Sequence, residues 1–149
     1  MKVEEGLLFI NDIDMATLGV FLCETEAGGH KNYDALLGGV ETKEQTVVDY
    51  AEKDGEELPD TIEQKVKARD IQLTFAIVAD NATEWLQRHG EFRRLLLSGW
   101  LNIRVPELNR TFKCYTKSMP AHSQMTLPKK DGRQIATMTV VLREPKPGI

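Results

Sequence analysis

Cysteine, histidine and long apolar runs are all scarce in this chain, and each shortage excludes a class of protein. The 149 residues include 2 cysteines and 3 histidines. Cys23 and Cys114 lie far apart, each inside a pattern that predicts a strand, and they form neither a zinc motif nor a disulfide framework. We expect two buried thiols in a reducing compartment, with one long-range disulfide as the alternative.

Segments that target a protein to a membrane are also missing from the sequence. No stretch reaches the roughly 18 consecutive apolar residues of a membrane span. The acidic start, Met1–Glu5, lacks the basic and apolar segments of a secretion signal. These features predict a protein made in the cytoplasm, with no membrane partner.

The balance of residue types is that of an ordinary globular protein. Apolar residues make up 41% of the chain and charged residues 28%. This composition and length predict a single domain, residues 1–149, whose core needs neither disulfides nor metals. A formal net charge of -4 disfavours a protein that grips nucleic acid by its phosphates, because that requires a clustered positive face.

The histidines and glycines do not form a catalytic or ligand-binding pattern. His30 lies in a glycine loop, His89 lies on a helical apolar stripe, and His122 lies in a predicted turn. No two of them are spaced as ligands on one element, so any zinc site would have to be assembled by the fold. The glycine pairs lack the Gly-Lys-Ser/Thr ending of a phosphate-binding loop. We expect no catalytic residue, no cofactor and no metal, and therefore not an enzyme.

The chain opens with two apolar runs around a polar turn. Residues 7–10 and 18–22 flank the turn Asn11–Asp14, which predicts a hairpin-like pair of strands. Gly19, inside the second run, predicts a bulge or a close approach between two backbone segments.

A long polar stretch, residues 25–66, follows. Short strands are predicted there only at Tyr33–Leu37 and Thr46–Tyr50. Between Glu41 and Glu63 acids outnumber the two lysines, Lys43 and Lys53. The acids are Glu41, Glu44, Asp49, Glu52, Asp54, Glu56, Glu57, Asp60 and Glu63. Such a run is usually a solvated loop, and loops of this length in a compact domain are commonly disordered or used for contacts.

A strand and the main helix come next. Apolar residues alternate with others from Ile71 to Ile77, which is strand periodicity. The helix is predicted over about residues 82–97, with Asn81 and Glu84 as a capping box. Its apolar stripe consists of Trp85, Leu86, His89, Phe92 and Leu96.

The remaining strand patterns follow one another in hairpin order. Residues 101–105 and 112–115 alternate around the turn Pro106–Asn109, and residues 134–143 form a last strand. Seven or eight strands and one major helix predict a mainly β protein of the α+β class. The expected architecture is an antiparallel β-sandwich or split barrel with one flanking α-helix.

The second half of the chain is locally basic. Basic residues outnumber acids from Arg104 to Arg133, and Lys113, Tyr115 and Lys117 are predicted to share one strand face. A solvated strand face accounts for this pattern, and a surface for single-stranded nucleic acid is the alternative. A third interpretation is that the acidic and basic regions pair between identical subunits, as a head-to-tail ring requires.

Three segments carry a further signal, and they are Phe9–Leu22 (FINDIDMATLGVFL), Lys67–Asp80 (KARDIQLTFAIVAD), and the helix with Leu95–Ser118. Together they resemble the N-terminal domain of phage distal tail proteins and, more broadly, the tail-tube fold. The first segment is similar to the family's opening, the second to its central strand, and the third to its helix and hairpin. The order and spacing of these segments carry the resemblance. The family's opening turn commonly has glycine where Asp12 stands, and its full-length members carry a further C-terminal domain.

The resemblance implies a structural subunit of a phage or prophage tail, either a distal tail protein or a tube-like protein. It implies self-association into rings, hexameric in the family, around a DNA conduit, and contacts with other tail proteins. The location implied is the virion tail, and the bacterial cytoplasm during assembly. DNA would pass through the ring without specific binding. The acidic loop around Asp49–Asp60 and the sheet edges are the expected intersubunit contacts.

The second hypothesis is a small β-rich binding module. It would take single-stranded nucleic acid through Lys113, Tyr115 and Lys117.

Overall fold

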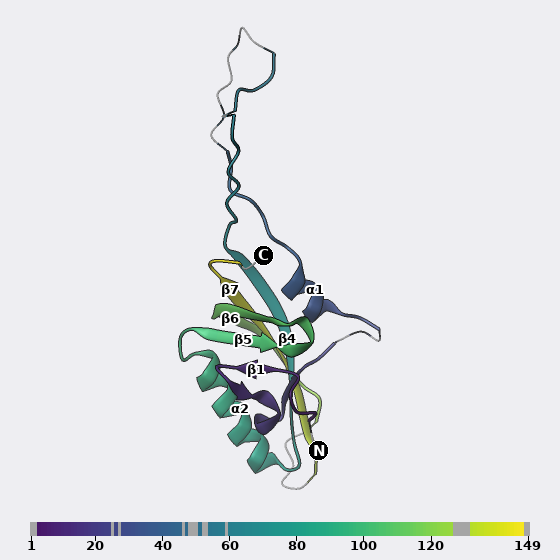
Figure 1. Cartoon of the computed structure of the whole chain (residues 1–149). Helices are drawn as coiled ribbons and strands as arrows, with labels where there is room; N and C mark the ends of the chain where they lie inside the picture. The colour runs from purple at the N-terminus through teal and green to yellow at the C-terminus, as the bar shows by residue number, and fades with distance from the viewer. Residues whose placement is uncertain are drawn as a thin grey trace.

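One curled, antiparallel sheet makes up most of the protein (Figure 1). The computed structural model describes residues 3–24, 26, 28–45, 47, 51, 54–58, 60–126 and 132–147. The sheet has seven strands in the order β2-β1-β5-β6-β7-β4-β3. The strands are β1 (Phe9–Ile10), β2 (Ile13–Asp14), β3 (Val20–Leu22), β4 (Arg69–Ala79), β5 (Leu101–Val105), β6 (Arg110–Gln124) and β7 (Gln134–Glu144). The other described elements are α1 (Lys31–Leu37), α2 (Ala82–Leu96) and the 3-10 helices η1 (Met15–Leu18) and η2 (Pro106–Leu108).

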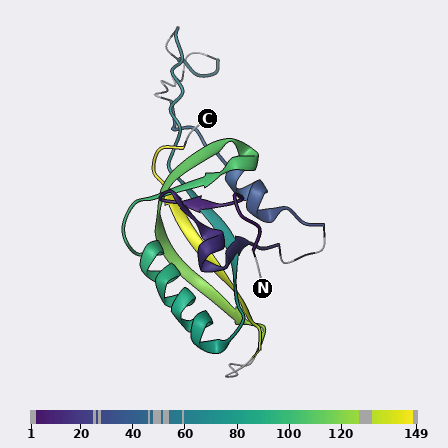
Figure 2. The same cartoon turned by 60° about the horizontal axis from the view of Figure 1, so that its bottom comes forward.

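The two outer strands of the sheet are neighbours in sequence, and this makes the sheet curl. Only η1 and Gly19 separate β2 from β3, and a 3-10 helix rises about 2 Å per residue. The two ends of the sheet are therefore brought close together at η1. Figure 2 shows the curled strands with α2 along one side. The predicted mainly β, α+β class is confirmed. Of the two predicted architectures, a β-sandwich or a split barrel, the single curled sheet corresponds to the split barrel, and it forms a half-barrel.

The core lies between α2 and one face of the sheet. Leu73, Phe75 and Ile77 alternate along β4 and are fully buried. The Phe92 ring of α2 meets the Phe75 ring edge-on, with centroids 5.2 Å apart. The Trp85 indole N–H donates to the Ile77 carbonyl at 3.0 Å. Because α2 covers this face, the opposite face of β5 and β6 is left to solvent.

Helix α2 confirms the predicted bounds and the predicted N-cap. The Asn81 side chain accepts a hydrogen bond from the Glu84 amide at 2.8 Å. The Glu84 carboxylate turns to Arg88, 2.6 Å away, so the reciprocal half of the capping box is replaced by an ion pair. Leu86 was predicted on the apolar stripe, and that is wrong. It is 61% exposed because it lies about 100° around the helix from the buried Trp85.

The opening segment does not form the predicted pair of strands. β1 pairs with β2 and with β5, whereas β3 pairs with β4 at the other end of the sheet. The close backbone approach predicted at Gly19 is confirmed. Gly19 ends η1 with φ +66, and a Cβ there would collide with the carbonyl oxygen of Val78. The Val78 amide donates to the Gly19 carbonyl at 2.9 Å, which explains why the two segments approach so closely.

The predicted short strand at Tyr33–Leu37 is wrong, because these residues belong to helix α1. The chain therefore has two described helices, where one was predicted. Neither described helix is long and apolar enough to cross a membrane. Most of the other strand predicted in this region, Thr46–Tyr50, lies outside the described residues.

Candidate functional site

The structure brings two of the three histidines together. His122 lies in β6 opposite Met138, so its predicted turn is wrong. Pro120 lies where the β6–β7 register shifts, between Ser118 and Ala121, and such an irregularity is where a strand tolerates proline. His89 stacks on Trp85 with ring centroids 5.0 Å apart and meets His122 edge-on at 5.5 Å.

The rings of Trp85, His89 and His122 pack together at the edge of the core. Burial lowers the pKa of His89, and the neighbouring His122 and Arg93 lower it further. The His89 imidazole is therefore neutral at pH 7. His30 stands apart from this cluster, immediately before α1. Within the described ranges, no group of three or more His, Cys, Asp or Glu side chains is placed to hold a metal ion.

Both cysteines are free thiols in the structure. Cys114 is buried in β6 as predicted, and burial raises its pKa to about 12. Cys23 follows β3 and is only half-buried, which corrects the expectation that it is buried inside a strand. Burial also raises the pKa of Cys23. Neither thiol has the lowered pKa of a nucleophile.

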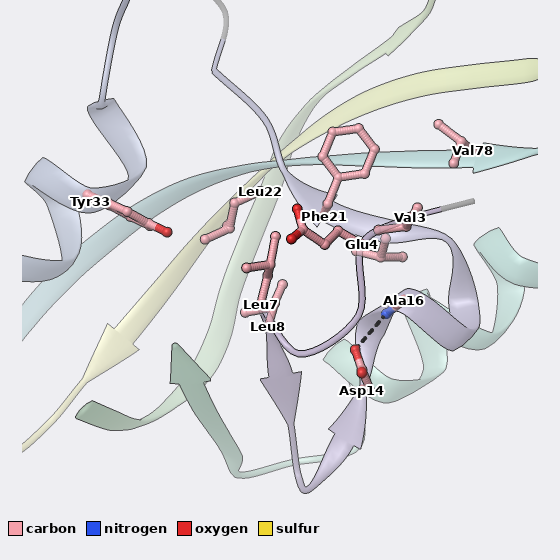
Figure 3. A pocket seen from close by; sticks show the side chains of 11 residues that line it. Val3, Glu4, Leu7, Leu8, Asp14, Ala16, Phe21, Leu22, Tyr33 and Val78 are labelled. Carbon is pink, nitrogen blue, oxygen red and sulfur yellow. Dashed lines mark hydrogen bonds between the residues drawn. The ribbon is translucent and has the colours of Figure 1, made fainter. Parts of the chain in front are cut away.

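A hollow of about 330 Å³ lies at the seam where the two ends of the sheet meet (Figure 3). Leu7 and Leu8 line it from one side, and Phe21 and Leu22 of β3 line it from the other. The Asp14 carboxylate at its rim accepts hydrogen bonds from the backbone amides of residues 16 and 6, both at 3.0 Å. The seam therefore offers mainly apolar contact, and its carboxylate holds the local backbone.

Residues 41–67 contain the feature that departs most from a compact domain. We define the arm as the described residues 41–45, 47, 51, 54–58 and 60–67. Thr42 and Val66 form an antiparallel bridge at its base. Backbone amides donate across the arm on either side of this bridge, both at 2.7 Å, from Lys43 to Lys65 and from Lys67 to Glu41. Figure 1 shows the arm leaving the body and extending well beyond the sheet.

The arm exposes acidic and apolar side chains together. None of the buried core residues comes from its described part. Val47, Leu58 and Ile62 are 44%, 42% and 49% exposed, among the acids that dominate this part of the sequence. Asp49, the first residue of the predicted contact loop, lies outside the described residues. An extended segment with exposed apolar side chains has the character of a contact surface.

The arm departs from a rigid base at the start of β4. The Arg69 guanidinium is buried and pairs with the buried Glu144 carboxylate at 2.7 Å. The same guanidinium donates to three carbonyls at the end of α1, those of Ala35, Leu36 and Gly38. One side chain therefore ties the last turn of α1 to β4 and β7, immediately beside the arm.

The other end of α1 is tied down as well. The Glu24 carboxylate accepts hydrogen bonds from the Lys31 and Asn32 amides at 2.8 and 3.1 Å. The Asn32 side chain accepts from the Thr74 amide at 2.8 Å and donates to the Thr74 carbonyl at 3.3 Å. These contacts cover the outer edge of β4 beyond the end of the short strand β3 and explain why this segment is a helix.

The outward face of β1, β5 and β6 gathers cations and aromatic rings. We define the cation–aromatic face as Phe9, Trp100, Arg104, Lys113 and Tyr115. The Arg104 guanidinium lies 4.0 Å from the Phe9 ring centroid, and the Lys113 ammonium lies 4.9 Å from a Trp100 ring centroid. Trp100 and Tyr115 meet edge-on at 5.7 Å and are 53% and 40% exposed. This surface presents positive charge and aromatic area to solvent.

The strand pattern of the sequence predicted part of the cation–aromatic face. Lys113 and Tyr115 point outward as predicted, each beside a buried neighbour. Lys117 lies at a register shift of β6, and its ammonium binds the Asp70 carboxylate at 2.8 Å. Arg143 binds the other oxygen of that carboxylate at 2.9 Å. Trp100 was missed because it precedes β5, and only the pairing of β5 with β6 sets it beside Tyr115.

The comparisons with known proteins give a likeness in structure and none in sequence. No protein-family model matches the chain, and no curated protein sequence matches it either. Among solved structures, it is similar to the crystal structure of the SPP1 Dit protein, described as a paradigm of the hub adsorption apparatus in phages that infect Gram-positive bacteria. The TM-score is 0.49 and the sequence identity 14%, over 93% of this chain and 50% of that one. The chain therefore spans about half the length of the structure it matches.

Proposed function

We propose that this protein is a structural subunit of a phage or prophage tail, which assembles into rings around a DNA conduit. The proposed role is structural and not catalytic. The resemblance of its three sequence segments to the distal tail and tube-like family directs the proposal to tails. The proposal also includes a hexameric ring, contacts with other tail proteins and location in the virion tail.

The arm is the observation that carries this proposal. The arm exposes Val47, Leu58 and Ile62, and its described residues add nothing to the buried core of their own domain. Such an extension gains free energy only when another surface covers it. The base of the arm is rigid, because Arg69 and Glu144 fix it to the sheet. A rigid base with an uncovered extension suits attachment to a neighbouring subunit.

The charge of the chain is compatible with a conduit. DNA must slide through such a ring, and a strongly positive lumen would hold its phosphates. A formal net charge of -4 avoids that attraction. In the described part of the chain, β5 pairs with β6 only as far as Cys114, so the rest of that edge of β6 has no partner strand and is available to a neighbouring subunit in a ring.

The test is the solution mass of the protein over a range of concentrations. We expect wild-type protein to form rings, seen by light scattering after size exclusion and by negative-stain imaging. A variant in which residues 45–63 are replaced by an Asn-Gly turn keeps the Thr42–Val66 bridge and is expected to stay monomeric. Its circular dichroism and melting temperature should match the wild type, because the arm adds nothing to the described core. A wild-type chain that is monomeric at every concentration would contradict the proposal.

A second candidate function is favoured by one observation. Trp100, Lys113 and Tyr115 combine exposed rings with a cation, as surfaces for single-stranded nucleic acid do. Oligonucleotide binding followed by fluorescence anisotropy separates the two functions. A binding module should lose affinity in Lys113→Glu, with a reduced dependence on salt. A tail subunit should show no such affinity to lose.

A further inference from the structure

We infer that the acidic arm of one copy binds the cation–aromatic face of a second copy. This inference rests on the proposed self-assembly and specifies which surface the arm meets.

The distal arm, meaning the part of the arm between Glu44 and Glu63, carries negative charge, whereas the cation–aromatic face is positive. From Glu44 to Glu63 the sequence has eight acids and one lysine. The other three lysines of this region, at positions 43, 65 and 67, lie at the base of the arm. The distal part therefore presents negative charge together with the exposed side chains of Leu58 and Ile62.

The cation–aromatic face has the complementary chemistry. In the described part of the chain, Arg104 and Lys113 contact aromatic rings and have no carboxylate partner. Lys117 and Arg143 differ from them, because Asp70 already neutralises both. Two cations are thus available for carboxylates, beside the exposed ring of Trp100. Tryptophan, tyrosine and arginine are also the residues that most often dominate the energy of protein interfaces.

The arm of the same copy is directed away from this face. The arm leaves the body beside the start of β4 and runs outward, whereas β5 and β6 lie within the body (Figure 1). The contact therefore requires a second molecule. An arm on one copy that meets a different surface on the next is a head-to-tail contact, and such contacts close into rings when the rotation allows.

A charge exchange between copies tests this contact. The face variant carries Arg104→Glu and Lys113→Glu with the native arm. The arm variant carries Glu44→Lys, Asp54→Lys, Glu56→Lys and Asp60→Lys with the native face, which leaves four acids against five lysines between residues 44 and 63. In each variant alone, arm and face carry like charges, and we expect the association constant to fall at least about 10-fold. Mixed in equal amounts, each arm meets a face of opposite charge, and we expect assembly to return in oligomers that alternate the two variants.

Three controls make the result decisive. Arg94→Glu, an exposed site on α2, changes the charge as one face substitution does and should assemble like the wild type. Melting temperatures show whether both variants are folded. Carbodiimide cross-linking of mixed ¹⁵N-labelled and unlabelled wild-type protein should join Lys113 of one copy to an arm carboxylate of another, which tests the contact without any substitution.

Each outcome decides the matter. The inference is supported if each variant alone fails to assemble, the mixture of the two assembles, and the cross-link between copies forms. If wild-type protein assembles while the face variant assembles equally well, the inference is wrong and the proposed function stands. If neither wild type nor mixture assembles, the proposed function is wrong as well. If the face variant instead loses binding to an oligonucleotide that the wild type holds, the face belongs to a nucleic-acid module and the inference is wrong.

Discussion

Replacing Arg69 with methionine is the substitution expected to do most damage at the base of the arm. The Arg69 and Glu144 side chains are 7% and 3% exposed, and their charged atoms lie 2.7 Å apart. Methionine keeps much of the volume of arginine but removes the charge. It leaves the Glu144 carboxylate buried without its cation and takes the donor away from the carbonyls at the end of α1.

The expected cost follows from that uncompensated charge. Breaking a buried ion pair by removing one partner costs about 3–5 kcal/mol. Domains of this kind unfold with only about 5–15 kcal/mol, so Arg69→Met should remove a large share of the stability. The double variant Arg69→Met with Glu144→Leu removes both charges and should recover more than half of the loss. The remaining deficit measures the lost hydrogen bonds to α1.

Urea unfolding followed by circular dichroism is the assay. With a typical urea dependence, we expect the midpoint of Arg69→Met to fall by about 1–3 M. Lys117→Met is the matched control, because it also breaks an ion pair, but one whose lysine side chain is 53% exposed. That control should stay within about 1 kcal/mol of the wild type. An Arg69→Met variant as stable as Lys117→Met would refute the reasoning.

Three further predictions concern single positions. Gly19→Ala should destabilise the fold by more than about 1 kcal/mol in thermal unfolding, because the new Cβ meets the Val78 carbonyl and φ is positive. Gly6→Ala is the control, since its φ is also positive but the space around it is open, and it should destabilise the fold less. Asn81→Ala should cost about 1 kcal/mol and Asn81→Ser much less, measured by urea unfolding, since serine also caps a helix. Burial lowers the pKa of His89 below its unfolded value of 6.5, so near this pH the unfolded chain binds more protons than the folded one. The free energy of unfolding should therefore fall as the pH drops through 6.5. The variant His89→Gln should flatten that pH dependence.

Local periodicity predicted the parts of the fold that local interactions decide. The alternation in β4, the hairpin of β5 and β6, and the last strand all lie where their patterns placed them. The helix α2 also begins at its predicted cap, because Asn81 bonds to an amide only three residues away. In each case the information lies within a few residues of the element itself, which is why a single sequence suffices to find it.

Contacts between distant segments decided the rest. Residues 31–37 are helical because Glu24 holds the start of the segment and Arg69 its end, and neither contact leaves a periodic trace in the sequence. The apolar runs of the opening looked like partners, yet curling of the sheet places β1 and β3 in different parts of it.

The sequence by itself determined the class of the fold, the strands β4, β5 and β7, the main helix and the acidity of the region around the arm. Only the tertiary structure showed that this region projects from a fixed base and that Trp100 joins Lys113 and Tyr115 in one exposed face. The physical reason is that propensity and periodicity act along the chain, whereas a surface is made by strands that pair across long separations in sequence.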